Sequence, residues 1–149
     1  MPIEQMFPKA QTDRMMKNLR TMGAPFGIIF SDITRISNSR LALQAAEFSK
    51  DQGRFEAFHD AVLHAYFAEG LDIGDREVIT QLGRDAGLDV PGLERALEEG
   101  TYLPRLRQMQ DEAARAGVTG VPTFVVAGKR TIVGAQPLDV FRNTLRGMK

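Results

Sequence analysis

Cysteine is absent from this chain of 149 residues, and no long apolar run is present either. Without a thiol, the chain can neither form a disulfide nor carry out dithiol exchange by itself. No stretch approaches the roughly 20 apolar residues that a membrane-spanning helix needs. Charged residues such as Lys9, Asp13 and Arg20 interrupt the N-terminal segment before an apolar region of signal-peptide length can form. We therefore expect a cytoplasmic protein.

Net charge of either sign is also lacking, because 19 basic residues balance 19 acidic ones. The distribution is uneven: acidic residues dominate between Glu47 and Glu99, and the flanks are basic. This pattern argues against the continuous basic face of a nucleic-acid-binding protein. Solvated helix faces explain the charges most simply. An acidic helical cap that pairs with the basic C-terminal part is the alternative.

Apolar residues recur at helical spacing over most of the chain and predict a helical part over about residues 9–116. Glycines stand between the periodic segments, and no repeat or low-complexity segment is present. At 149 residues the chain can bury a sizeable core. The positions that define the predicted helices are Met15, Met16, Leu19 and Met22; Leu41, Ala45 and Phe48; Phe55, Phe58, Val62 and Tyr66; Val78, Ile79, Leu82 and Ala86; Leu93 to Leu97; Tyr102, Leu106, Met109, Ala113 and Ala116; and Leu138, Phe141 and Leu145.

The most informative segment runs from Gly117 to Val126 and reads GVTGVPTFVV. It joins a helix stop, a tight turn and an X-Pro bond to an apolar strand. Proline is tolerated at the first residue of a strand, and an X-Pro bond there can adopt the cis isomer at little cost. We therefore expect a hairpin and a last helix over about residues 121–147. A purely structural role of this proline is equally compatible with the residues alone.

Together, these motifs resemble the DsbA-type thioredoxin-like oxidoreductases, and most closely their FrnE-like branch. The resemblance rests on GVTGVPTFVV, on a short hairpin followed by Gly134-Ala135-Gln136-Pro137, and on two upstream runs, Asn38-Ser39-Arg40-Leu41-Ala42 and Ala65-Tyr66-Phe67-Ala68-Glu69-Gly70. It extends over most of the chain from about Gly27 and is weaker before it. Leu43 stands where the branch has a histidine, so no role of that histidine is transferred.

The resemblance implies a fold, a binding loop and one decisive difference. The implied fold class is α+β and mostly helical, a partial DsbA/thioredoxin-like fold in one domain over residues 1–149. In that family the proline is cis, so the resemblance implies a cis bond between Val121 and Pro122. The family's cis-proline loop also binds substrate backbone, which points to Thr119, Gly120, Val121 and Pro122 as substrate-binding residues. The family's Cys-x-x-Cys helix and first strand have no counterpart here, because the match begins at about the point where they end. We therefore expect an N-terminally truncated domain with no catalytic residue.

A two-stranded hairpin is marginally stable alone, and an apolar strand edge is normally covered. In the thioredoxin-like fold, the strand that begins at Thr123 pairs with a strand this chain lacks. Ile28-Ile29-Phe30 could supply a strand, another polypeptide could supply one, or a second copy could pair across the edge. We favour the homodimer because it needs only this sequence. Because Phe124 and Val125 point to opposite faces, one should meet the last helix and the other the covering partner.

Other reactive candidates are weak. His59 and His64 are five residues apart, which does not place them on one helix face, so we expect no metal site. Asp75 is expected to cap the helix that carries Val78 and Ile79. No cofactor, nucleic acid or membrane is expected as a partner. The cluster of N-terminal methionines, Met1, Met6, Met15, Met16 and Met22, is expected to fill core gaps.

Two classes of function follow. The first is a DsbA-family protein that is redox-inactive by itself and retains binding of a peptide or a glutathione-like compound at the cis-proline loop. The second is a non-catalytic interaction or assembly module that uses the open hairpin edge.

Overall fold

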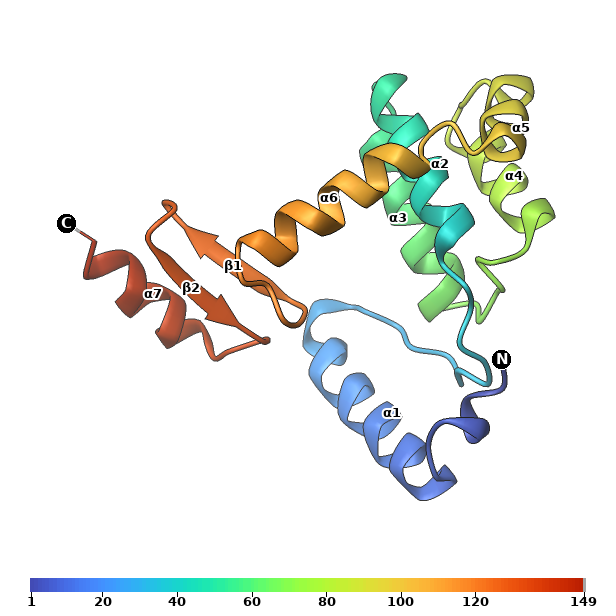
Figure 1. The fold of residues 1–149 in the computed structure, drawn as a ribbon. Helices are drawn as coiled ribbons and strands as arrows, with labels where there is room; N and C mark the ends of the chain where they lie inside the picture. The colour runs from blue at the N-terminus through green and yellow to red at the C-terminus, as the bar shows by residue number, and fades with distance from the viewer. Residues whose placement is uncertain (149) are drawn as a thin grey trace. The chain divides into compact units, whose positions relative to one another are not determined.

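The computed structural model describes residues 1–148, and within them it contains seven α-helices and one two-stranded antiparallel sheet (Figure 1). Each periodic segment that the sequence predicted as a helix is a helix, and the hairpin follows the last long one. The mostly helical α+β class is therefore confirmed. The residues form two compact units, which divide after Leu106, within helix α6. Each unit is described separately below.

The first unit is helical. Two short 3-10 turns, Ile3–Gln5 and Ala24–Phe26, flank its first helix. No helix in the described residues is long and apolar enough to cross a bilayer. The α-helices of this unit are α1 (Lys9–Gly23), α2 (Arg40–Asp51), α3 (Phe55–Phe67), α4 (Arg76–Asp85), α5 (Val90–Glu99) and the first turn of α6 (Leu103–Arg115).

The core of the first unit lies between α2, α3, α4 and α5, which contact one another. Phe58, Ile79 and Leu93 are its largest fully buried side chains. Ala45 lets α2 approach closely because its small side chain is also fully buried. The sequence pattern assigned all four residues to the apolar faces of their helices, and burial of these faces orients the helices around one core.

The start of α4 is fixed by Asp75, as predicted. The Asp75 carboxylate accepts a hydrogen bond of 2.8 Å from the backbone N–H of Glu77. This bond satisfies one of the N–H groups that a helix leaves without a partner at its first turn. Asp75 therefore has a structural role as the N-cap of α4.

The predicted core role of the methionines is largely wrong. Met16 is buried, but Met1, Met6, Met15 and Met22 are exposed. Helix α1 contacts mainly the short turns on either side of it. Periodicity identified the apolar face of this helix, but it could not show how little of the unit packs against that face.

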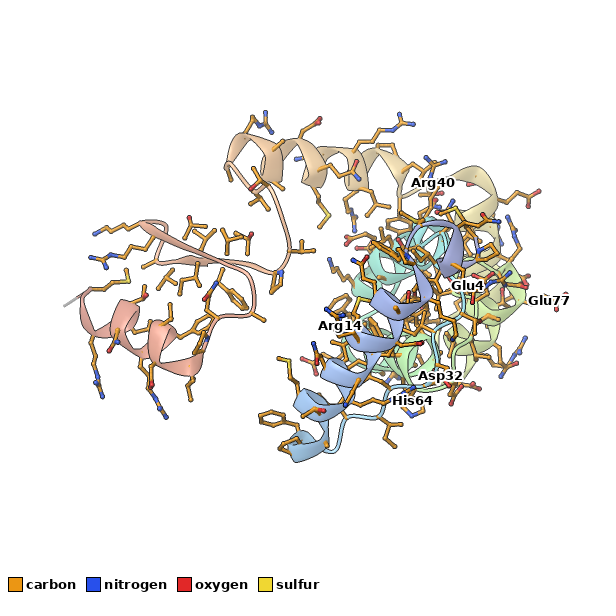
Figure 2. The ribbon with its side chains drawn as sticks, turned by 90° about the horizontal axis from the view of Figure 1, so that it is seen from below. Glu4, Arg14, Asp32, Arg40, His64 and Glu77 are labelled. Carbon is orange, nitrogen blue, oxygen red and sulfur yellow. The ribbon has the colours of Figure 1, made fainter. Side chains whose placement is uncertain are left out.

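The second unit contains the rest of α6, the hairpin and the last helix. Strand β1 (Thr123–Val126) pairs with β2 (Arg130–Val133), with Phe124 opposite Ile132 and Val125 opposite Thr131. Ala127 and Gly128 in the connection both have positive φ, at 48° and 68°, as a type I′ hairpin turn requires. The last helix, α7 (Leu138–Arg146), lies along this hairpin (Figure 2).

One face of the hairpin is covered by α7. The Phe124 ring meets the Phe141 ring edge-on at 4.9 Å between centroids, and Ile132 is buried beside them. Since Phe124 and Val125 point to opposite faces of the strand, this contact confirms that one of them lies against the last helix. Ile28, Ile29 and Phe30 form no strand, so the sheet in the described residues has only β1 and β2.

Candidate functional site

The loop between α6 and β1 is anchored at its start by the way α6 ends. Gly117 adopts φ 72°, which favours glycine. The N–H of Gly117 donates to the carbonyl of Ala114, and the N–H of Val118 donates to the carbonyl of Ala113, both at 3.0 Å. This pair of bonds is a Schellman motif. The backbone alone thus sets the direction in which the chain leaves α6.

The other end of the loop is anchored on the hairpin. The N–H of Gly134 donates to the carbonyl of Pro122 at 2.8 Å. The Thr123 hydroxyl donates to the carbonyl of Gly120 at 2.6 Å. The Val121–Pro122 peptide bond is cis, in agreement with the expectation from the sequence. The loop is therefore a defined bend rather than a connection of arbitrary shape.

The four residues expected to bind substrate are neighbours in this bend, and three of them are exposed. Thr119, Val121 and Pro122 are exposed, and Gly120 is half-buried. Val121 is 90% exposed. Within residues 1–148, neither the N–H nor the C=O of Val121 makes a hydrogen bond. An apolar side chain and two free backbone groups are thus presented together.

The free backbone groups continue along β1. In an antiparallel pair, residues alternate between those that bond to the partner strand and those that face away from it. The bond from Gly134 to Pro122 sets the phase, so Phe124 and Val126 bond to β2. The N–H and C=O groups of Thr123 and Val125 therefore point to the open edge. Because unpaired groups on a strand edge attract another strand, this edge can bind extended backbone.

The sheet face opposite α7 is uncovered. Val125 is 57% exposed and Val133 is 51% exposed, and both stand on this face. The sequence predicted that one of Phe124 and Val125 faces away from the last helix, and Val125 is that residue. Val125-Val126 and Ile132-Val133 place apolar residues on both sides of the hairpin, a pattern typical of strands buried on both faces.

The loop is poor in reactive side chains. None of the four loop residues has a side chain that titrates. Among residues 1–148, no three histidine, cysteine, aspartate or glutamate side chains lie close enough together to hold a metal ion. His59 Nδ1 lies 3.6 Å from Asp60, and His64 Nδ1 lies 3.2 Å from Glu69. The side chains of the four loop residues thus include no acid, base or thiol.

Comparison with known proteins gives three results. The profile of the DSBA-like thioredoxin domain family matches residues 1–146. The uncharacterized protein YwbO of Bacillus subtilis (strain 168) is 33% identical over 119 residues, which are 79% of this chain and 59% of that protein. The crystal structure of the probable DsbA oxidoreductase SCO1869 from Streptomyces coelicolor is similar with a TM-score of 0.86 at 28% identity, over 99% of this chain and 67% of that one.

The family match spans nearly the whole chain, whereas the chain spans only 59% of the length of its curated relative. The helices, the hairpin and the loop with its cis bond all lie within the matched residues. Family membership is thus shown by sequence and by structure, and it comes with a sequence that contains no cysteine. The chain belongs to the DSBA-like thioredoxin domain family.

Proposed function

We propose that this chain is a polypeptide-binding module of the DSBA-like family that has no dithiol chemistry of its own. It holds an extended segment along the open edge of β1 and against Val121 and Pro122. On the motifs it carries, we place it in the FrnE-like branch. The absence of cysteine supports the loss of redox activity, because thiol–disulfide exchange requires a thiolate.

One observation carries the proposal: the free backbone groups of Val121, Thr123 and Val125 lie on one continuous stretch. Pairing of an extended peptide with a sheet edge derives affinity from backbone hydrogen bonds, and side-chain pockets add specificity. The resemblance to DsbA-type proteins supports the same assignment, because the residue before their cis-proline binds substrate backbone. Thr119 and Gly120 shape the approach to this stretch, and Pro122 fixes it.

A second copy of the chain is the occupant we propose in the absence of another polypeptide. The uncovered face with Val125 and Val133 adjoins the open edge, so a second chain can pair with one and pack on the other. The homodimer and the peptide complex then compete for the same edge. This competition unites the two functions: assembly and binding use one surface.

Two matched proline variants test the edge. Val125 and Thr131 face each other in the hairpin, but their outward N–H groups lie on opposite edges of the sheet. Proline is tolerated where the strand N–H faces away from its partner. Val125→Pro should therefore block pairing at β1, whereas Thr131→Pro leaves the β1 edge unchanged.

The probe is a fluorescein-labelled heptapeptide of alternating valine and threonine with terminal lysines, followed by anisotropy. Its affinity for the β1 edge should fall at least tenfold in Val125→Pro and stay within twofold in Thr131→Pro. Sedimentation velocity should show the dimer lost only in Val125→Pro. The contact of Phe124 with Phe141, seen by NMR, reports whether each variant keeps the hairpin fold. Equal behaviour of the two folded variants would refute the proposal.

A further inference from the structure

The first unit has an apolar groove of about 590 Å³ that the proposed function does not use. It is lined by the segment that follows α1, by the last turns of α3 and by Leu19 of α1. The Phe30 and Phe67 rings meet edge-on at 5.8 Å between centroids. His64 is its one titratable lining residue, and the label in Figure 2 marks its position on α3. The groove thus accepts an apolar group.

The segment from Ile28 to Phe30 runs without helix, turn or bend, and Figure 1 shows it as an extended trace after α1. The N–H of Ile28 donates to the carbonyl of Gly23 at 3.1 Å, and the Phe30 carbonyl accepts a bond of 2.9 Å from Arg20. Both groups thus face α1. Ile29, which is 69% exposed, lies between them.

The backbone N–H and C=O groups of Ile29 face the side opposite to α1. In extended chain, backbone groups of successive residues face opposite sides, so the N–H and C=O of Ile29 point away from α1. Ser31, two residues on, donates its N–H to the Phe67 carbonyl of α3 at 2.8 Å. The Ile29 groups therefore face the α3 side, where the groove lies, and within residues 1–148 they make no hydrogen bond.

These free groups decide which ligand the groove fits. A volume of this size accommodates either an acyl chain or peptide side chains, but an acyl chain cannot bond to the Ile29 N–H and C=O. His64 Nδ1 lies 3.2 Å from the Glu69 carboxylate, and Arg20, which is outside the lining, pairs with Asp32 at 2.5 Å. Among the described residues, no lysine or arginine lines the groove, so the lining offers no such cation to an anionic head group. The ligand that matches is apolar where it enters the groove and able to pair with backbone.

We propose that this groove is a second polypeptide-binding site, which takes an extended segment with alternating apolar side chains. The segment pairs with the N–H and C=O of Ile29 and places its apolar side chains against Leu63 and Phe67. This site belongs to the first unit, whereas the β1 edge belongs to the second. It therefore does not depend on the proposed function.

The test uses the full chain with Val125→Pro, so that the β1 edge is blocked. The same valine–threonine heptapeptide is titrated, and amide NMR follows Ile29. Binding should slow hydrogen exchange of the Ile29 N–H at least tenfold. A peptide that is N-methylated on alternate residues cannot pair with Ile29 and should bind at least tenfold more weakly.

A matched pair of leucines provides the side-chain control. Leu63 lines the groove, and Leu43 lies on α2 outside it; they are 43% and 48% exposed. Because both are on the surface, neither Leu63→Gln nor Leu43→Gln should disturb folding. Affinity for the peptide should fall about tenfold in Leu63→Gln and remain unchanged in Leu43→Gln.

Three results would overturn the proposal. One is tighter binding of dodecanoate than of the peptide in this groove, which would make it a lipid site. Another is peptide binding that leaves the Ile29 amide unprotected. The third is protection of Ile29 by dilution-sensitive self-association without peptide, which would assign the groove to a second copy. If only the proposal for the β1 edge fails, these three tests of the groove still apply.

Discussion

Gly117 is the residue at which α6 stops and the candidate binding loop begins. Its φ of 72° lies in the left-handed region, yet a Cβ at this position would meet no atom within 4 Å. Space is therefore available for a larger residue, and only the backbone conformation disfavours it. A Cβ at Gly120 would also meet open space, but Gly120 does not adopt a positive φ, so its backbone conformation does not disfavour a larger residue.

The two glycines make a matched pair of variants. Gly117→Ala should destabilise the second unit by about 1 kcal/mol, because an L-residue in the left-handed region is strained by roughly that amount. Gly120→Ala should be neutral or slightly stabilising, since alanine restricts the unfolded chain. Hydrogen exchange of the Phe124 and Ile132 amides measures both. Equal effects of the two substitutions would contradict the role given to Gly117.

At the scale of elements, α6 is held to α2 by a cluster of charges within the first unit. Arg105 contacts the carboxylate of Asp51 at 2.9 Å and the buried carboxylate of Glu47 at 3.4 Å. The Tyr102 hydroxyl donates to Asp51 at 2.8 Å. The hydrogen bonds from Arg105 and then from Tyr102 lower the pKa of Asp51 below its usual value. Asp51 therefore stays ionised in the folded chain to lower pH than in the unfolded chain.

The depressed pKa of Asp51 fixes the sign of a pH effect. A carboxyl with a lowered pKa contributes stability above its unfolded pKa, and this contribution is lost as the pH falls through the folded value. Asp51→Asn should reduce stability at pH 7 by less than about 1 kcal/mol, since the pair is partly exposed. The difference from the unsubstituted chain should shrink below about pH 4.

Asp85→Asn is the control for this prediction. Asp85 lies on the surface of α4 and accepts a hydrogen bond from Gln81, but it contacts no cation in the described residues. Urea unfolding at several pH values compares the two variants. If both lose stability to the same extent and with the same pH profile, the cluster does not stabilise α6 through charge.

Much at this scale could be predicted from sequence, and the failures have physical causes. Helices α2 to α5 were predictable because their apolar stripes face one shared core. The exposed Met15 and Met22 were not, because a stripe does not reveal whether a neighbour covers it. The groove beside Ile29 depends on which backbone groups remain unpaired after folding, and no periodicity reports that.

At the scale of the whole molecule, the division into two compact units after Leu106 could also not be predicted from the sequence. Apolar spacing continues from Tyr102 to Ala116 without a break, so one helix was predicted and one helix is present. The contacts of its two ends nevertheless belong to different units. A helix pattern specifies local structure, whereas unit boundaries depend on contacts between distant residues.

The whole chain should show no dithiol activity. Insulin reduction and refolding of a scrambled substrate both require a thiolate nucleophile, and the sequence contains none. Turnover by the purified chain should equal the uncatalysed background, with a family member that carries its Cys-x-x-Cys pair as the positive control. Activity above background that persists after repurification would contradict this expectation.

The division into units also bears on how the chain is made on the ribosome. The core of the first unit draws all its residues from Ala42 to Leu97, so this unit can bury its apolar surface before the hairpin has been translated. Strand β1 and its open edge emerge later and in quick succession with β2. The open edge of Thr123–Val126 therefore becomes available to a partner only after the residues of that core have been synthesised.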